Sequence, residues 1–135
     1  MADIISDVIE KVPEYKEFMT VEELDQSTFN LARKYPDLVT VFEAGKTRDG
    51  RPIYVLKIGN GRKKALLFGC PHPNEPVGTL VLEHLSWQLV ENDEFREMFD
   101  YTWYIVKVAD KDGLKLNEGW LKGPFTILNL SLIHI

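Results

Sequence analysis

The stretch Lys64–Leu85, KALLFGCPHPNEPVGTLVLEHL, joins two apolar runs through a loop that contains three prolines. The first run, Lys64–Phe68, is typical of a β-strand. The second predicts a helix over Val77–Val90 that is apolar around most of its circumference, and such a helix is expected to be largely buried against a sheet. Pro76 suits the first helical position, where no backbone N–H is missed. The stretch therefore predicts a strand–loop–helix unit.

Strand patterns continue on both sides of this unit. Residues rich in β-branched and apolar types predict strands at Leu38–Glu43, Pro52–Ile58 and Thr102–Ala109. Short turns at Gly45–Arg51 and Gly59–Gly61 predict that the first three strands are antiparallel neighbours. Hairpins followed by strand–helix–strand indicate an α/β fold with a mixed β-sheet packed with helices.

Helix signals precede the strands. Thr20-Val21-Glu22-Glu23 reads as a capping box that opens a helix running to about Lys34. We expect this helix to end before Tyr35-Pro36, because the residue before a proline disfavours helical geometry. Its expected buried positions include Leu24, Phe29, Leu31 and Ala32. Residues 1–12 predict a shorter amphipathic helix, and 93–99 a helical connector.

Composition narrows the class of protein. The net charge is −5, from 21 acidic and 16 basic residues without a basic block, which argues against nucleic acid as a partner. No apolar stretch reaches the roughly 18 residues that a membrane helix needs. The N-terminus has no basic region of the secretory type. The single cysteine excludes an intrachain disulfide, so we expect a cytoplasmic protein. From the charge and the short apolar stretches, we expect it to bind neither nucleic acid nor a membrane.

The proline-bounded loop carries one imidazole and one carboxylate, His72 and Glu75, three residues apart. Zinc accepts both kinds of ligand at about 2 Å. A turned loop at the end of a strand can aim both side chains at one point, at the sheet edge where α/β proteins usually bind ligands. The alternative is a loop histidine beside a solvated glutamate, because loops are normally polar and exposed. A catalytic zinc site also usually has three protein ligands.

Other metal-ligating types have ordinary explanations beside the functional one. Cys70 is either a soft ligand or a small buried residue. His84 lies within the predicted helix, where a packed or helix-edge histidine is expected. His134 is the penultimate residue. We expect neither histidine to be a ligand.

Charged residues near the later loop leave similar alternatives open. Asp110 and Asp112, in DKDG, either hold a cation or serve turn geometry. Arg51 either binds substrate or pairs with a surface acid. Glu118 is expected to be a solvated loop carboxylate, and 117–123 (NEGWLKG) an ordered loop.

Several of these motifs, in this order, resemble the N-terminal part of the zinc carboxypeptidase family. Tyr35-Pro36 matches its Tyr-Pro start, and Gly45–Ile53 (GKTRDGRPI) matches its Gly-x-[ST]-x-x-Gly-Arg-x-Ile turn. A strand then runs into His-x-x-Glu, and Asp110–Gly113 stands where the family usually has Asn-Pro-Asp-Gly. The resemblance spans roughly residues 29–113.

The resemblance implies a Zn²⁺ site with His72 and Glu75 as ligands, and hydrolysis of a peptide substrate at its C-terminal residue. It also implies the N-terminal part of a zinc-carboxypeptidase-like (phosphorylase/hydrolase-like) fold. The family's third histidine ligand, general-base Glu and arginines lie further downstream, and Arg96 is the last arginine here. We therefore expect no catalytic residue in this chain, which is interpreted as an N-terminal fragment inactive by itself.

The expected organisation is an N-terminal helical extension (1–20), a partial zinc-carboxypeptidase-like domain (21–125) and an apolar tail (126–135) foreign to the family. Two other functions stay open. His72–Gly78 also resembles the His-Gly-Asn-Glu-Pro-x-Gly loop of zinc amide hydrolases of the succinylglutamate desuccinylase and aspartoacylase type, which would imply an N-acyl amino acid substrate. The Gly45–Ile53 turn favours the carboxypeptidase. The third possibility is a catalytically inert fragment.

Overall fold

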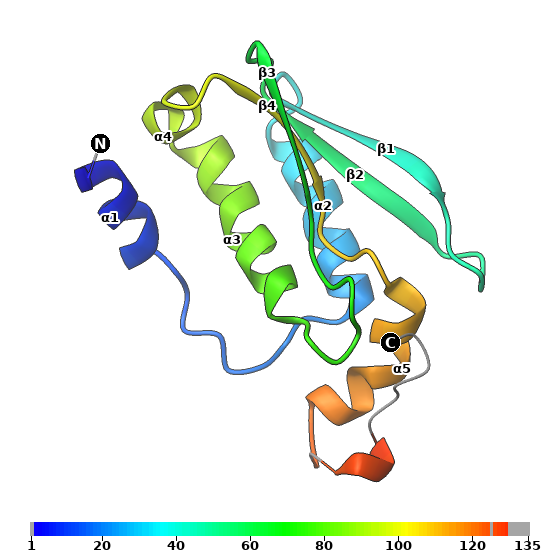
Figure 1. Ribbon diagram of the computed structural model, residues 1–135. Helices are drawn as coiled ribbons and strands as arrows, with labels where there is room; N and C mark the ends of the chain where they lie inside the picture. The colour runs from blue at the N-terminus through cyan, green and yellow to red at the C-terminus, as the bar shows by residue number, and fades with distance from the viewer. Residues whose placement is uncertain (1, 125, 130–135) are drawn as a thin grey trace.

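A mixed sheet with helices packed on it is the framework of the computed structural model, which describes residues 2–124 and 126–129 (Figure 1). Within these residues the elements are α1 (Ala2–Glu10), α2 (Val21–Lys34), β1 (Val39–Lys46), β2 (Pro52–Ile58), β3 (Lys63–Phe68), α3 (Val77–Glu91), α4 (Asp93–Glu97), β4 (Tyr101–Val106), α5 (Lys111–Leu121) and a 3₁₀ turn (Ile127–Asn129). In the described part of the chain, no helix is both long and apolar enough to span a bilayer.

The strand order is β1-β2-β4-β3. β1 is antiparallel to β2, β2 is antiparallel to β4, and β3 is parallel to β4. The α3 helix makes the crossover between the two parallel strands, as a parallel pair requires. This arrangement confirms the predicted α/β class and the mixed sheet.

The expectation that β2 and β3 are antiparallel neighbours is wrong, because β4 lies between them. The β4 strand, YTWYIV, is the more apolar one and takes the interior position, whereas β3 carries Lys63 and Lys64 and lies at the edge. The chain reaches that edge through Gly61. A Cβ on Gly61 would lie 2.3 Å from the Asp100 carbonyl carbon, so only glycine can pass this close to the start of β4.

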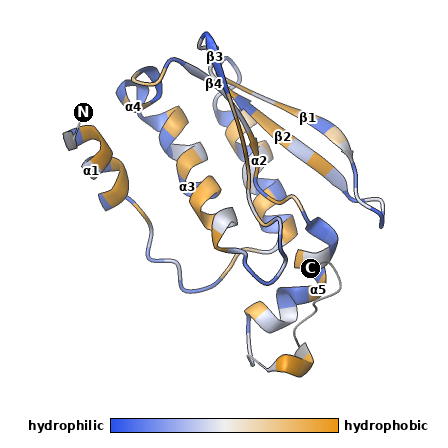
Figure 2. Ribbon diagram, in the orientation of Figure 1, coloured by the Kyte–Doolittle hydropathy of each residue, from blue (hydrophilic) through white to orange (hydrophobic). Residues whose placement is uncertain are grey.

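The main core lies between the sheet and α2 and α3, which cover one of its faces (Figure 1). Both helices and the sheet contribute fully buried aliphatic side chains, among them Leu31, Leu56, Leu89 and Ile105. A second cluster, around Leu24, Cys70, Val108 and Leu114, joins α2 to α5. Hydrophobic residues alternate with polar ones along these elements, as Figure 2 shows.

The capping box confirms the predicted start of α2. The Thr20 hydroxyl accepts from Glu23 N at 3.2 Å, and the Glu23 carboxylate accepts from Thr20 N at 2.7 Å. Leu24 and Leu31 are fully buried as expected. The expected burial of Phe29 is wrong, because its side chain is 38% exposed. The Phe29 ring packs edge-on against the Tyr54 ring, at a centroid distance of 4.8 Å.

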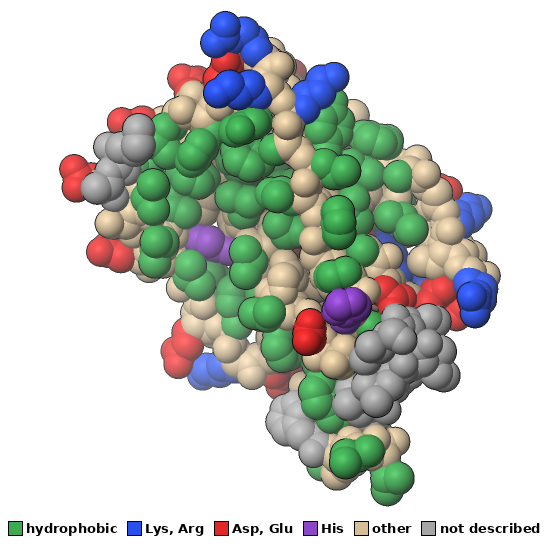
Figure 3. All heavy atoms as spheres, viewed as in Figure 1, with side chains coloured by type: hydrophobic (Ala, Val, Ile, Leu, Met, Phe, Trp, Pro, Cys, Tyr) green, Lys and Arg blue, Asp and Glu red, His purple; other side chains and the backbone are tan. Residues whose placement is uncertain are grey.

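The α3 helix is largely buried, as expected, but one side of it is exposed, and Val81 on that side is 58% exposed. Val77 on the same side is also exposed, as are Leu66 and Phe68 of β3. Within the described residues β3 pairs with β4 alone. Hydrophobic side chains accordingly gather across the middle of the face viewed in Figure 3. The edge strand and the neighbouring side of α3 thus leave apolar surface in contact with solvent.

The predicted loops at 110–113 and 117–123 are wrong, because Lys111–Leu121 forms α5. Asp110 caps this helix, its carboxylate accepting from Gly113 N at 2.9 Å. Leu114 and Leu121 are buried against the α2 side of the molecule. Glycine lowers helix propensity by about 1 kcal/mol relative to alanine, which hid this helix in the sequence. The cap and the burial outweigh that cost.

The helix predicted in residues 1–12 is present as α1. It is tied to α3 by His84, whose Nε2 lies 2.8 Å from the Val8 carbonyl oxygen and donates to it. The boundaries at 20 and 125 stay predictions. Of the predicted tail, residues 130–135 lie outside the described part of the chain.

Candidate metal centre

The loop that follows β3 is fastened to the loop that follows β4. The two parallel strands end at the same edge of the sheet, where Gly69 N donates to the Val106 carbonyl at 2.9 Å. Ala109 N donates to the Gly69 carbonyl at 2.8 Å, and Asp110 N to the Cys70 carbonyl at 3.0 Å. These bonds fix the base of the proline-bounded loop.

Two glycines allow helices to approach this loop closely. A Cβ on Gly69 would lie 2.9 Å from the Gly78 carbonyl oxygen, so the start of α3 packs directly on the base of the loop. A Cβ on Gly113 would lie 2.7 Å from the Cβ of Pro73, which is fully buried. The α5 helix thereby supports the middle of the loop, between the two candidate ligands.

His72 and Glu75 are brought together at the tip of this loop. Glu75 N donates to the His72 carbonyl at 3.1 Å, which closes the turn between them. The imidazole Nδ1 then lies 3.5 Å from the Glu75 carboxylate oxygen Oε2. The two side chains are 55% and 69% exposed. An imidazole nitrogen and a carboxylate oxygen that converge at a solvent-facing point are a suitable pair of donors for zinc.

Among the described residues, no third metal-ligating side chain joins His72 and Glu75. Within 2–124 and 126–129, no group of three or more His, Cys, Asp or Glu side chains is arranged to hold a metal ion. The donor set therefore fits zinc in part, since a catalytic site usually has three protein ligands. That His72 and Glu75 bind zinc stays a prediction.

Cys70, two residues before His72, has a structural role. Its side chain is completely buried, and its thiol donates to the His72 carbonyl at 3.5 Å. Burial, with a smaller contribution from Asp110, raises the pKa of the thiol to about 12. The thiol is therefore protonated near neutral pH, whereas metal binding requires the thiolate.

The remaining histidines are not brought to this site by the described structure. His84 bonds the Val8 carbonyl on the α1 side of α3, as expected for a packed histidine. His134 lies outside the described residues.

Two buried oxygen atoms lie at this edge, one on Asp110, which the sequence named as a cation ligand or a turn residue, and one on Asn74, to which the sequence gave no role. In the described part of the chain, three buried side-chain polar atoms have no hydrogen-bond partner, and two of them are Asn74 Oδ1 and Asp110 Oδ2. Asn74 lies between the candidate ligands, and Asp110 lies where β4 leads into α5. Unpaired buried acceptors are rare. Their position beside the loop is a signal of a polar site that sequence spacing alone could not give.

Asp112, near the start of α5, bonds to the turn between β1 and β2. Its carboxylate accepts from Asp49 N at 3.1 Å and from the Arg51 guanidinium at 2.5 Å. Burial opposes ionisation of Asp112, but hydrogen bonds from Asp49 and Thr47 and the Arg51 guanidinium together lower its pKa. Arg51 thus pairs with acids, as one of its two interpretations expected, and ties the β1–β2 turn to α5.

Glu118 is not the solvated loop carboxylate that was predicted. It lies on α5, where its carboxylate accepts from Val21 N at 3.0 Å and from Lys115 Nζ at 2.8 Å. This bond to the first residue of α2 joins two helices, so Glu118 is committed to the fold.

Known proteins are similar to this chain in sequence and in fold. The family model described as zinc carboxypeptidase matches residues 24–123. Carboxypeptidase B of Helicoverpa zea is 32% identical over 111 residues, which are 75% of this chain and 25% of that protein. Mast cell carboxypeptidase A of Homo sapiens is 30% identical over 118 residues, 79% of this chain and 28% of that protein. The chain thus spans about a quarter of the length of these relatives.

Solved structures agree at the level of the fold. A metallo-carboxypeptidase from Burkholderia cenocepacia superposes with a TM-score of 0.63 at 24% identity, covering 70% of this chain and 28% of that one. Carboxypeptidase A from Helicoverpa armigera gives a TM-score of 0.59 at 24% identity, covering 82% of this chain and 30% of that one.

Proposed function

We propose that this chain, which belongs to the zinc carboxypeptidase family, supplies two ligands, His72 and Glu75, to the zinc ion of a metallocarboxypeptidase site. The observation that carries the proposal is the 3.5 Å approach of His72 Nδ1 to Glu75 Oε2, at the end of two parallel strands. Neither side chain is committed elsewhere in the described structure, and both face solvent.

Each part of the loop has a task in this proposal. His72 would donate a neutral imidazole nitrogen and Glu75 a carboxylate oxygen, and the Gly69–Gly78 and Pro73–Gly113 contacts would keep them at a fixed separation. When bound, zinc would lower the pKa of a water molecule and polarise the scissile carbonyl of the C-terminal peptide bond. The protonated Cys70 thiol would not compete as a ligand.

The described residues contribute two donors, so we expect the 135-residue chain to bind zinc weakly and to hydrolyse no peptide by itself. Hippuryl-amino acids, as peptide substrates, and N-acyl amino acids can be assayed in parallel with added zinc. No turnover of either is expected. Cleavage of N-acyl amino acids alone would reject the carboxypeptidase proposal and favour a zinc amide hydrolase of the succinylglutamate desuccinylase and aspartoacylase type.

Zinc binding itself is tested by calorimetric titration of the chain near neutral pH. We expect weak one-site binding that is lost in His72→Ala and in Glu75→Gln. His84→Gln is the matched control, because it changes a histidine on the same molecule that bonds a backbone carbonyl instead; its titration should equal that of the parent. Titrations of His72→Ala identical to those of the parent would remove the ligand assignment.

A further inference from the structure

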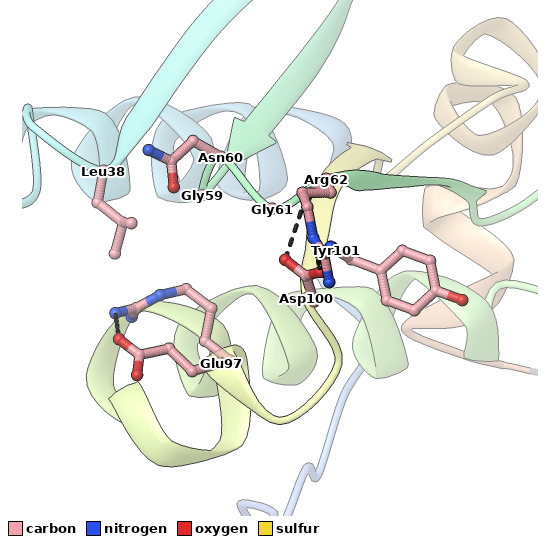
Figure 4. A pocket seen from close by; sticks show the side chains of 9 residues that line it. Leu38, Gly59, Asn60, Gly61, Arg62, Glu97, Asp100 and Tyr101 are labelled. Atoms are coloured by element: carbon pink, nitrogen blue, oxygen red, sulfur yellow. Dashed lines mark hydrogen bonds and ion pairs between the residues drawn. The ribbon is translucent and has the colours of Figure 1, made fainter.

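The opposite end of β3 from the candidate metal centre borders a hollow of about 460 Å³ (Figure 4). It lies between the Gly59–Arg62 loop, which leads into β3, and the segment where α4 leads into β4. Polar side chains and backbone from both segments line it, including Asn60, Arg62, Glu97 and Asp100.

The charged groups of this hollow are already paired. Arg62 Nε donates to Asp100 Oδ2 at 2.7 Å, as the dashed line in Figure 4 shows. Arg96 donates to the Leu89 carbonyl at 2.9 Å and to Asp93 at 2.7 Å. An ionic ligand would have to break these pairs, so the hollow gives no reason to propose one. Of the polar side chains named above, only the Asn60 amide has no partner in the described structure.

Asn60 is followed by Gly61, and of the six asparagines in the sequence it alone precedes a glycine. Asn60 is exposed in a loop outside the strands. Among the described residues, neither its side-chain amide nor the Gly61 N–H takes part in a hydrogen bond. Because glycine has no Cβ, its nitrogen can approach the preceding side chain without steric obstruction. The electrophile and the nucleophile of an intramolecular reaction are therefore adjacent and free.

We propose that Asn60 is a site of spontaneous deamidation. The Gly61 backbone nitrogen loses its proton to solvent base and attacks Asn60 Cγ, the new N–C bond closes a succinimide, and the side-chain nitrogen leaves as ammonia. Water then opens the ring at either carbonyl, which gives aspartate or isoaspartate at position 60. The only co-reactant is water. In the net reaction one water molecule is consumed and one ammonia molecule is released.

The fold keeps this sequence pair in place. Gly61 cannot be replaced, because a Cβ there would lie 2.3 Å from the Asp100 carbonyl carbon and 2.5 Å from Tyr101 N. The two Asp-Gly pairs in the chain differ: Asp49 is bonded to Arg51, and Asp112 is bonded to Arg51 and to Asp49 N. Both side chains are carboxyl groups held in hydrogen bonds, and neither offers the amide that releases ammonia.

The isoaspartate product would disturb the start of β3, because it adds one carbon to the backbone between residues 60 and 61. The loop is fixed on both sides of that bond. Gly59 N donates to the Leu38 carbonyl at 3.1 Å, and the Gly61 carbonyl accepts from Thr102 Oγ1 at 2.7 Å. The longer backbone cannot keep both contacts, so the modified chain should open more readily at this edge strand.

The test is incubation of the folded chain at mildly alkaline and at neutral pH, followed by peptide mapping and measurement of released ammonia. We expect the peptide containing residue 60 to split into aspartate and isoaspartate forms, faster at higher pH. Asn30, Asn74 and Asn117, which precede Leu and Glu, should keep their amides over the same period.

Asn60→Gln is the matched variant, since it keeps the amide but must close a less favourable six-membered ring. It should lose the early release of ammonia, while Asn74→Gln should not. Asn60→Asp provides the reference for the unbranched product and should fold, because the Asn60 amide bonds nothing in the described structure. Retention of the Asn60 amide while another asparagine converts, or equal ammonia release from parent and Asn60→Gln, would overturn the proposal.

Discussion

Cys70 illustrates at the scale of one residue how burial sets chemistry. Its backbone has φ of +50°, and its side chain is enclosed between the sheet edge and α5. In this environment the neutral thiol is favoured, and the pKa rises from 9.0 to about 12. The sequence left two interpretations of Cys70 open, a soft metal ligand and a small buried residue, and its complete burial supports the second.

A pH dependence follows from this shift. Because the folded pKa is raised, the stabilisation by the protonated thiol is fully present below pH 9 and is lost as pH rises towards 12. The free energy of unfolding, measured in urea across this range, should fall more steeply for the parent than for Cys70→Ala. The variant's cavity lowers stability by an amount independent of pH, so parallel curves would contradict the assigned burial.

The proline-bounded loop, at the scale of one element, is positioned by its neighbours more than by its own bonds. Gly113 of α5 contacts buried Pro73, the residue after His72. The same helix contains Gly119, around which a Cβ would meet nothing within 4 Å. Two glycines in one helix therefore differ only in what lies opposite them.

Alanine substitutions should separate the two. Gly119→Ala is expected to stabilise the chain by up to about 1 kcal/mol, the difference in helix propensity. Gly113→Ala should instead destabilise it, because the new Cβ would lie 2.4 Å from Asp110 Oδ2 and 2.7 Å from Pro73 Cβ. It should also weaken zinc binding by displacing His72. Urea unfolding and zinc titration check both; stabilisation by Gly113→Ala would show that α5 does not support the loop.

A buried ion pair links the elements of the whole molecule. Lys107, just after β4, donates to Glu83 of α3 at 2.6 Å, and both side chains are less than a tenth exposed. Ser27 of α2 donates to the same glutamate, and Trp87 donates to it at 2.8 Å. Burial lowers the pKa of Lys107, although the Glu83 carboxylate opposes that shift. The sheet and both packed helices thus meet at one polar cluster.

Removing one partner should be costly. Glu83→Gln leaves the Lys107 ammonium buried without its paired carboxylate, and breaking such a pair typically costs about 3–5 kcal/mol. Lys107→Met combined with Glu83→Gln removes the uncompensated charge, so the double variant should be more stable than Glu83→Gln alone. Chemical unfolding of the parent, Glu83→Gln and the double variant gives the comparison. A single variant as stable as the parent would mean that the pair is not buried in solution.

Local sequence determined the parts whose causes lie within a few residues. The Thr20–Glu23 capping box fixed the start of α2, strand patterns identified all four described strands, and the His72–Glu75 spacing allowed the two side chains to converge. Caps, turns and periodicity act over one or two turns of chain, so they are legible without the fold.

Tertiary structure alone decided what depends on partners distant in sequence. The sequence did not predict that β4 lies between β2 and β3, that Lys111–Leu121 forms a helix or that Phe29 is exposed. Each results from contacts across many residues: the apolar strand takes the interior of the sheet, and burial of Leu114 against α2 outweighs the glycines of α5. A single sequence states what each segment prefers, and the packing of segments against one another decides which preference prevails.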